Sequence, residues 1–413
     1  MSDSSIPLGD GKFAVALDQP RTIDELRETV RTRVGQGHAI YPQGGCTSLD
    51  YGDPPSREGV AISTRHLSRV IDYPHEDMTI TIEAGMTLAA IDAILDTQQQ
   101  RLCIDAPQRD RATIGGMLAT NWTGPKRYGL GRPRDQIIGI SFVNAAAELI
   151  HGGGRVVKNV AGYDFPKLLT GSMGTLGIIA EVTLKVRPKP EVSAIVLVEV
   201  APAKLALALD RLNTSQARPI AIEVLVGLKG LPQRGAEGSK GIVAVGLEGT
   251  QATVGWEQER VLHELSQYGG EPPRDRTWVG NNAQETWDAM AWSDRTDQRV
   301  SIQANIRPSM VAHFLGEFDP LQVVIQAHAG NGIVRVHLEA SRGLEDTHAA
   351  IVRLRQLARS YGGSLTVLKC PTAWKPALKV WGDPRPDWLI AERIKKALDP
   401  TCAMNPGRFV GNI

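Results

Sequence analysis

Three evenly spaced glycines, Gly171, Gly174 and Gly177, limit most strongly what the segment LLTGSMGTLGIIAEV (168–182) can form. A helix there would lose about 1 kcal/mol for each glycine relative to alanine. A flexible linker would not run directly into an apolar stretch such as the one from Ile178 onward. The segment therefore predicts a tight loop whose bare backbone presses close to a neighbour and is held by a buried strand.

Two more glycine turns stand earlier in the chain, beside other predicted elements. A short strand enters the turn QGGCTS within residues 39–48, and the sequence TIGG at 113–116 leads into a helix of small residues. Backbone N–H groups exposed by such turns bind anions, and Thr47, Ser48 and Thr113 add hydroxyl donors. A tight turn with only a structural role is the alternative for each one. Three such turns in one block favour a diphosphate held by backbone dipoles.

The common nucleotide-binding fingerprints are absent from the sequence. No G-x-x-x-x-G-K-[ST] motif occurs, so nothing supports a P-loop nucleotide hydrolase. The glycines from Gly171 to Gly177 precede a strand, whereas the Rossmann fingerprint for NAD needs a helix there. The near balance of 46 Lys and Arg against 45 Asp and Glu, with only 5% aromatic residues, also argues against a nucleic-acid surface.

Sequence features that report on cellular location are few. The N-terminus has no basic segment followed by an apolar core, so a secretory signal is not expected. No run of about 18 apolar residues occurs, which predicts no membrane span. The four cysteines form no C-x-x-C pair, so neither an iron–sulfur cluster nor a structural zinc is expected, and such cysteines suit a reducing cytoplasm.

The chain divides by its pattern into three parts and predicts an α+β fold. Residues 1–190 combine many strands with helices at 22–37 and 87–100, and the sequence RPKP ends this block. Residues 191–370 show the order β-α-β-β-α twice, the second time with a closing strand. This order predicts two ferredoxin-like halves in one antiparallel sheet under helices. Residues 371–413 contain an amphipathic helix and a coil with a fixed path.

Four motifs, read in order, carry a family resemblance: YPQGGCTS at 41–48, TIGG at 113–116, GSMGTLGII at 171–179, and LDP with NPGR within 398–408. In these motifs the chain resembles the FAD-binding family of vanillyl-alcohol oxidase and para-cresol methylhydroxylase. The resemblance implies a two-lobed FAD-binding domain, an α+β cap domain and a C-terminal segment that returns to the FAD domain. The sequence VKNVAGYD (157–164) narrows it to the FAD-binding E subunits of bacterial glycolate oxidases, complexes that also contain a flavin D subunit and an iron–sulfur F subunit.

The resemblance implies a set of FAD contacts drawn from all these motifs. The main chain at Gly174, Gly177 and Ile178 is expected to lie against the flat parts of the cofactor, where glycine avoids a Cβ clash. Some family members attach FAD to a histidine in the first turn, and this turn has none, so noncovalent FAD is expected. Cys46 stands where the family has glycine, as a packed thiol or, alternatively, as a thiol bonded to flavin. The implied contacts are Pro42, Gln43, Gly44, Gly45, Cys46, Thr47, Ser48, Thr113, Gly115, Gly116, Gly174, Gly177, Ile178, Asn405 and Arg408.

The last two of these residues are expected near the isoalloxazine ring. A cation at Arg408 would stabilise the anionic reduced flavin. The alternative for Arg408 is a surface salt bridge, which contributes little to stability.

On the substrate side, the family's lactate and glycolate dehydrogenases carry H-A-G-D-G-N-x-H, where this chain has HAGNGIVR at 328–335. Only the first histidine is kept, and one neutral imidazole is a poor metal site, so no metal is expected. The catalytic candidates are His328, as a base or to orient a 2-hydroxy acid, and Arg335, which would pair with its carboxylate. A structural histidine at a strand end is the alternative for His328, and His337 is expected to be structural.

The function implied is that of an FAD-dependent oxidoreductase subunit in a hetero-oligomer. A small 2-hydroxy acid would pass hydride to FAD and become a 2-oxo acid, and electrons would leave through D-type flavin and F-type iron–sulfur partners. The altered histidine motif favours a chain that only holds FAD. An assembly subunit, or a standalone flavin oxidase of another alcohol or hydroxy acid, would fit the same motifs. The expected location is the cytoplasm, with any contact to the inner membrane made through partners.

Overall fold

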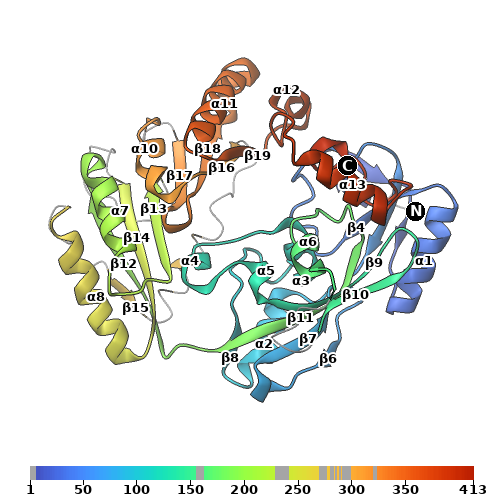
Figure 1. Ribbon diagram of the computed structural model, residues 1–413, viewed down its shortest axis with the longest axis horizontal. Coiled ribbons are helices and arrows are strands. Elements are labelled where there is room, and N and C mark those ends of the chain that lie inside the picture. Colours follow the sequence, from blue (N-terminus) through green and yellow to red (C-terminus); the bar gives the residue numbers. More distant parts are fainter. Residues whose placement is uncertain are drawn as a thin grey trace. The chain divides into compact units, whose positions relative to one another are not determined.

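The computed structural model divides the chain into two compact units. Unit 1 contains residues 1–123, 132–189 and 383–413, and unit 2 contains 124–131 and 190–382. Both ends of the chain therefore belong to unit 1 (Figure 1). The described residues are 6–154, 162–227, 241–268, 277–279, 283, 286–287, 290, 299–319 and 323–413. Most of the VKNVAGYD motif, residues 157–161, lies outside them.

The first sheet of unit 1 is parallel, in the order β3-β5-β4. Helix α1 (Ile23–Gly35) lies within the predicted range 22–37 and begins after Thr22, whose Oγ1 accepts a hydrogen bond of 3.1 Å from the amide of Glu25. Its Leu26 and Val30 are fully buried in the core that this sheet shares with the helix. The strands are β3 (Leu17–Asp18), β4 (Ala39–Gln43) and β5 (Gly59–Ser63), and a separate hairpin is formed by β1 (Ile6–Gly9) and β2 (Lys12–Ala14).

The second sheet of unit 1 is antiparallel, in the order β10-β9-β11-β7-β6, and β8 pairs with the far end of β11. Strand β11 (Ile178–Pro188) starts directly after the glycine loop, as predicted. Helix α2 (Leu88–Asp96) has Thr87 as its N-cap but ends before the predicted residue 100, because strand β8 begins at Gln100. The other elements are β6 (Val70–Asp72), β7 (Thr79–Glu83), β8 (Gln100–Leu102), α3 (Ile114–Thr120), α5 (Pro133–Gln136), β9 (Ile137–Val143), β10 (Leu149–Gly153) and α6 (Phe165–Leu169).

The C-terminal segment returns to the first sheet. Helix α13 (Trp388–Leu398) is the amphipathic helix predicted within residues 371–413, and the coil after it pairs in parallel with β4 through Ile40 and Met404. The amide of Ile40 donates to the carbonyl of Ala403 at 2.8 Å, and the amide of Asn405 donates to the carbonyl of Ile40 at 2.8 Å. The coil thus pairs with β4 at its second residue, Ile40.

Unit 2 contains one antiparallel sheet, with the strand order β15-β12-β14-β13-β17-β18-β16-β19, and helices that connect its strands (Figure 1). The first half runs from β12 to β15 and the second from β16 to β19. In each half the first strand lies between the third strand and the last one. The second strands, β13 and β17, pair with each other and so join the two halves. The predicted pair of ferredoxin-like halves in an α+β fold is confirmed; β15 is an addition to it. The elements are β12 (Val192–Val200), α7 (Leu205–Asn213), β13 (Ala221–Val226), β14 (Gly241–Gly249), α8 (Gln251–Leu265), β15 (Thr277–Val279), β16 (Arg299–Asn305), α10 (Val311–Leu315), β17 (Val323–His328), β18 (Ile333–Glu339), α11 (Gly343–Ser360), β19 (Ser364–Lys369) and α12 (Lys375–Leu378).

Two short segments belong to a different unit from the one that the predicted domain boundaries assign to them. Residues 124–131, with helix α4 (Arg127–Leu130), cluster with unit 2, where the amide of Gly129 donates to the carbonyl of Ile220 at 2.9 Å. Residues 371–382 also cluster with unit 2, because Arg355 Nη1 donates to the carbonyl of Leu378 at 2.7 Å. The contact boundary near the C-terminal part therefore falls after residue 382 and not after 370.

Candidate cofactor-binding site

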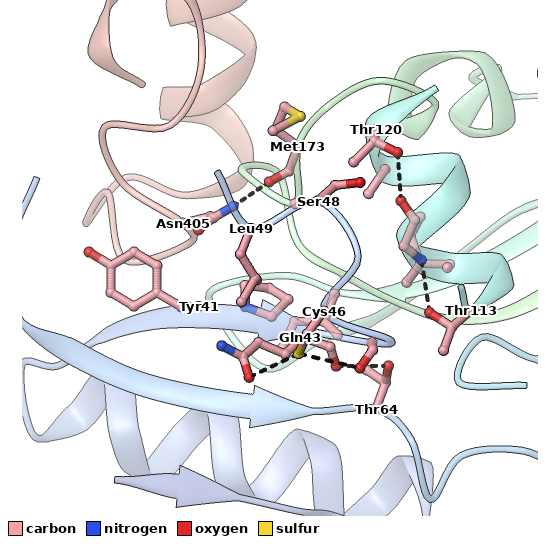
Figure 2. A pocket seen from close by; sticks show the side chains of 18 of the residues that line it. Tyr41, Gln43, Cys46, Ser48, Leu49, Thr64, Thr113, Thr120, Met173 and Asn405 are labelled. Carbon is pink, nitrogen blue, oxygen red and sulfur yellow. Dashed lines mark hydrogen bonds between the residues drawn. The ribbon is translucent and has the colours of Figure 1, made fainter. Parts of the chain in front are cut away.

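A pocket in unit 1 encloses about 900 Å³, its open mouth included. Figure 2 shows that its side chains come from β4, from helix α3 and from the coil after α13. All fifteen predicted FAD contacts line it: Pro42, Gln43, Gly44, Gly45, Cys46, Thr47, Ser48, Thr113, Gly115, Gly116, Gly174, Gly177, Ile178, Asn405 and Arg408.

The turn after β4 supplies hydrogen-bond donors. Across the described residues, no acceptor meets the backbone amides from Gly44 to Ser48. Gln43 is buried and fixes the start of the turn, because its Nε2 donates to the carbonyl of Pro7 at 2.6 Å. A Cβ on Gly45 would lie 1.8 Å from the carbonyl oxygen of Arg111. Glycine therefore lets this turn pack against the segment before the second turn, and a row of amides stays open to an anion.

Cys46 adopts a left-handed backbone conformation within this turn, with φ of 56°. Its Sγ lies 3.7 Å from Gln43 Oε1 and 3.8 Å from the carbonyl oxygen of Gly44. Burial raises the pKa of the thiol, against the opposing influence of Arg65 and Arg111. A protonated thiol is a poor nucleophile, so this geometry favours the packed thiol over a bond to flavin.

The second turn contributes shape more than donors. Thr113 caps helix α3, because its Oγ1 accepts a hydrogen bond of 3.3 Å from the amide of Gly116. Figure 2 shows Thr113 and this hydrogen bond as a dashed line. The amide of Gly115 donates to the carbonyl of Ala84 at 2.8 Å. The two glycine amides of this turn are therefore not open as expected, because that of Gly115 donates to Ala84 and that of Gly116 donates to Thr113. A Cβ on Gly44 would lie 2.0 Å from Thr113 Oγ1, so glycine brings the first two turns into contact.

In the third turn, Gly174 and Gly177 are required by the backbone conformation and by packing. Gly174 has φ of 70°, a conformation that residues with a Cβ rarely adopt. A Cβ on Gly177 would lie 2.6 Å from the carbonyl oxygen of Val143 in β9. Both residues line the pocket, yet the missing Cβ of Gly177 faces the sheet and not the pocket interior. Glycine at 177 is thus required for packing of the loop on the sheet.

The two C-terminal residues are fixed by the first unit. Asn405 Nδ2 donates to the carbonyl of Met173 in the third turn (Figure 2). Arg408 is only 4% exposed, and its Nη1 lies 3.2 Å from Asp10 Oδ2. Its Nη2 donates to the carbonyls of Leu49 and, at 2.9 Å, Tyr51. The alternative of a surface salt bridge for Arg408 is wrong, because its ion pair with Asp10 is buried. The carboxylate of Asp10 already balances the charge of the guanidinium.

Several residues of the pocket were missed by the sequence motifs. Most of them neighbour a predicted contact in the chain or lie on helix α3, and a wider reading of each motif would have included them. Leu8 lies on β1 and Thr64 directly follows β5, and no local signal marks either of them. The additional lining residues are Leu8, Tyr41, Leu49, Thr64, Ala119, Thr120, Met173 and Ile179.

A family model described as FAD binding domain matches residues 14–153, which include the first two turns. Glycolate oxidase subunit GlcE of Escherichia coli (strain K12) is 30% identical over 240 residues, which are 57% of this chain and 67% of that protein. The chain belongs to the FAD-binding family of the vanillyl-alcohol oxidase and para-cresol methylhydroxylase type. It is an FAD-dependent oxidoreductase.

Longer alignments extend the similarity of this FAD-dependent oxidoreductase beyond the matched domain. D-2-hydroxyglutarate dehydrogenase of Xanthomonas citri pv. viticola is 26% identical, and the alignment spans 96% of this chain and 89% of that protein. A solved structure of alkyldihydroxyacetonephosphate synthase superposes with a TM-score of 0.67 at 17% identity, over 95% of this chain and 77% of that one. The oxidoreductase therefore shares its overall fold with this family along nearly its whole length.

The catalytic candidates of the oxidoreductase lie in unit 2, on one face of the sheet. His328 is 1% exposed, and its Nδ1 lies 2.8 Å from both carboxylate oxygens of the fully buried Glu223 on β13. Gln326 Nε2 donates to the same carboxylate at 3.1 Å. One strand further on, the Nε of the buried Arg335 donates to Gln303 Oε1 at 3.1 Å. Sequence reasoning missed Glu223, because no spacing within the chain marks a partner 105 residues away.

His337 also lies on strand β18 of the oxidoreductase. Its Nδ1 lies 2.8 Å from the Oγ of Ser301, and both residues are buried. In the part of the chain that the structure describes, no cluster of three or more His, Cys, Asp or Glu side chains could hold a metal ion. Within the same part, every helix is too short or too polar for a membrane span.

Proposed function

We propose that this chain is the FAD-binding subunit of a glycolate oxidase or dehydrogenase complex that acts on a small 2-hydroxy acid. The observation that carries the proposal is the unit 1 pocket, which unites all the predicted contacts around the open amides from Gly44 to Ser48. The relative named glycolate oxidase subunit GlcE supports the role as a subunit. Relatives named D-2-hydroxyglutarate and D-lactate dehydrogenase support a 2-hydroxy acid as the substrate.

Recognition of FAD by this chain rests on its main chain. The open amides after β4 would donate to the diphosphate oxygens, and the hydroxyls of Thr47 and Ser48 lie in the same pocket. The turn has no histidine, and burial keeps the Cys46 thiol protonated, so FAD is held without a covalent bond. When bound, FAD supplies the acceptor for the hydride that leaves a 2-hydroxy acid.

His328 is the candidate base for the substrate hydroxyl. Glu223 accepts a hydrogen bond from Nδ1, which makes Nε2 the basic nitrogen of the ring. Arg335, oriented by Gln303, would pair with the carboxylate that every 2-hydroxy acid carries. Electrons would then leave through D-type flavin and F-type iron–sulfur subunits, which would also provide any contact with the inner membrane.

A second candidate is a subunit that holds FAD without oxidising the substrate itself. The burial of His328 and Glu223, at 1% and 0% exposed, favours this candidate, because a base must reach the hydroxyl proton directly or through one water.

An anaerobic absorbance experiment separates the two candidates. We expect the purified chain to be yellow, and glycolate or D-lactate to bleach it if the chain is catalytic. His328→Asn should then slow bleaching by about a hundredfold, whereas His313→Asn, at an exposed position on α10, should not. Bleaching only after a D-type partner is added supports the FAD-holding subunit, and a colourless, folded chain contradicts the whole proposal.

A further inference from the structure

We propose that Lys395 fastens the C-terminal coil to the walls of the FAD pocket, so that FAD binding and docking of residues 399–408 are one coupled event. Lys395 is 1% exposed. Its ammonium donates to the carbonyl of Thr175 at 2.7 Å, to Asp399 Oδ2 at 2.6 Å and to the carbonyl of Met404 at 2.7 Å. An ammonium has three N–H groups, and each of them has an acceptor here.

Asp399 shapes the coil that Lys395 holds. This carboxylate is fully buried, and it accepts from the amides of Ala403 at 2.9 Å and Met404 at 2.7 Å. The hydroxyl of Thr401 also donates to it, at 3.1 Å. These bonds close residues 399–404 into a compact turn, and the amide of the next residue, Asn405, donates to the carbonyl of Ile40 in β4.

The two carbonyl acceptors of Lys395, those of Thr175 and Met404, lie next to two different walls of the pocket. Thr175 stands between Gly174 and Gly177 of the third turn, and Met404 precedes Asn405, which itself bonds to the carbonyl of Met173. Neither Lys395 nor Asp399 lines the pocket. Lys395 is therefore a positioning residue, which joins the third turn to the coil from behind.

Coupling to FAD follows from this arrangement. Asn405 and Arg408 line the pocket only while the coil is docked, so FAD meets its complete site only in the docked state. A ligand that prefers one state stabilises that state by the same factor by which the state improves its affinity. FAD should therefore protect the coil, and loss of the Lys395 bonds should weaken FAD binding.

The test uses the full chain after removal of FAD, titrated with FAD by the change in flavin fluorescence. Lys395→Met should raise the dissociation constant for FAD by about tenfold or more. Lys396→Met, at the exposed neighbouring position, should leave the constant within about twofold of the original chain. An unchanged dissociation constant in Lys395→Met would overturn the proposal.

A double variant separates positioning from general stability. Lys395→Met alone leaves the buried Asp399 carboxylate without its ion-pair partner, whereas Lys395→Met with Asp399→Asn leaves no unpaired charge and keeps an amide oxygen as an acceptor for the coil amides. We expect this double variant to melt at a higher temperature than Lys395→Met alone but not to regain affinity for FAD. Recovery of both would show that the ion pair only stabilises the fold.

Hydrogen exchange in the unaltered chain gives a test that needs no variant. FAD should slow amide exchange in residues 399–408 together with that in the third turn. If FAD binds and exchange in these residues does not change, the coupling is refuted while the FAD site stands. If FAD does not bind at all, the site itself is refuted.

Discussion

Open amides distinguish the first glycine turn from the second at the scale of single residues. Among the described residues, nothing accepts from the row Gly44 to Ser48, whereas the amides of Gly115 and Gly116 donate to Ala84 and to Thr113. Buried or half-buried N–H groups normally find partners, so such an open row marks a place for a bound anion. Because the chain belongs to an FAD-binding family, the anion expected at this turn is the diphosphate of FAD.

Gly45→Ala tests this turn. The new Cβ would lie 1.8 Å from the carbonyl oxygen of Arg111, so the turn must move and its amides lose their common direction. We expect FAD affinity to fall by about tenfold and the chain to lose about 1–3 kcal/mol of stability. Gly35→Ala is the matched control, because no atom lies within 4 Å of its Cβ position. Equal FAD affinity in both variants would contradict the role of the turn.

Glu257 on α8 gives a pH-dependent prediction. Burial raises its pKa from the ordinary 4.5 to about 7, although Arg218 opposes the shift. The folded state therefore holds a proton that the unfolded state releases, and stability falls as the pH rises from 4.5 through 7. Glu257→Gln should melt at the same temperature as the original chain near pH 4.5 and at a higher temperature at pH 8. Glu259→Gln, at an exposed position of the same helix, should show no such gain at pH 8.

Helices and strands follow local signals wherever capping or periodicity is strong. Thr22, Thr87 and Thr250 each accept a hydrogen bond from the amide three residues later, and a helix starts after each one. The order of strands in the unit 2 sheet, by contrast, is not set by local signals. It depends on how β13 and β17 meet, and these strands are far apart in the sequence.

Gly255 offers a test at the scale of one helix. It lies inside α8 with no atom within 4 Å of its Cβ position. Alanine there gains helix propensity and meets no clash, so Gly255→Ala should raise stability by about 1 kcal/mol. Urea unfolding followed by circular dichroism measures the gain. A loss of stability would show that the helix needs the glycine for a contact.

At the scale of the whole molecule, two units with separate cores should respond differently to the cofactor. The described pocket lies entirely in unit 1. A ligand at a hundred times its dissociation constant adds about 2.7 kcal/mol to the stability of the state that binds it. We expect FAD to slow amide exchange in β4, β9 and β11 more than in β12 and β14 of unit 2. Equal protection of both sets of strands would contradict a site built by unit 1.

Short motifs in the sequence, through the family resemblance that they carry, were enough to predict the family, the fold class and the fifteen residues around the pocket, because such motifs are local information. Tertiary structure decided which donors stay open, as the amide of Gly115 is used by Ala84. It also decided that the missing Cβ of Gly177 faces β9, and that Glu223 holds His328. The physical reason is the same in each case: whether a polar group or a Cβ position is free depends on chain that is distant in sequence and adjacent only after folding.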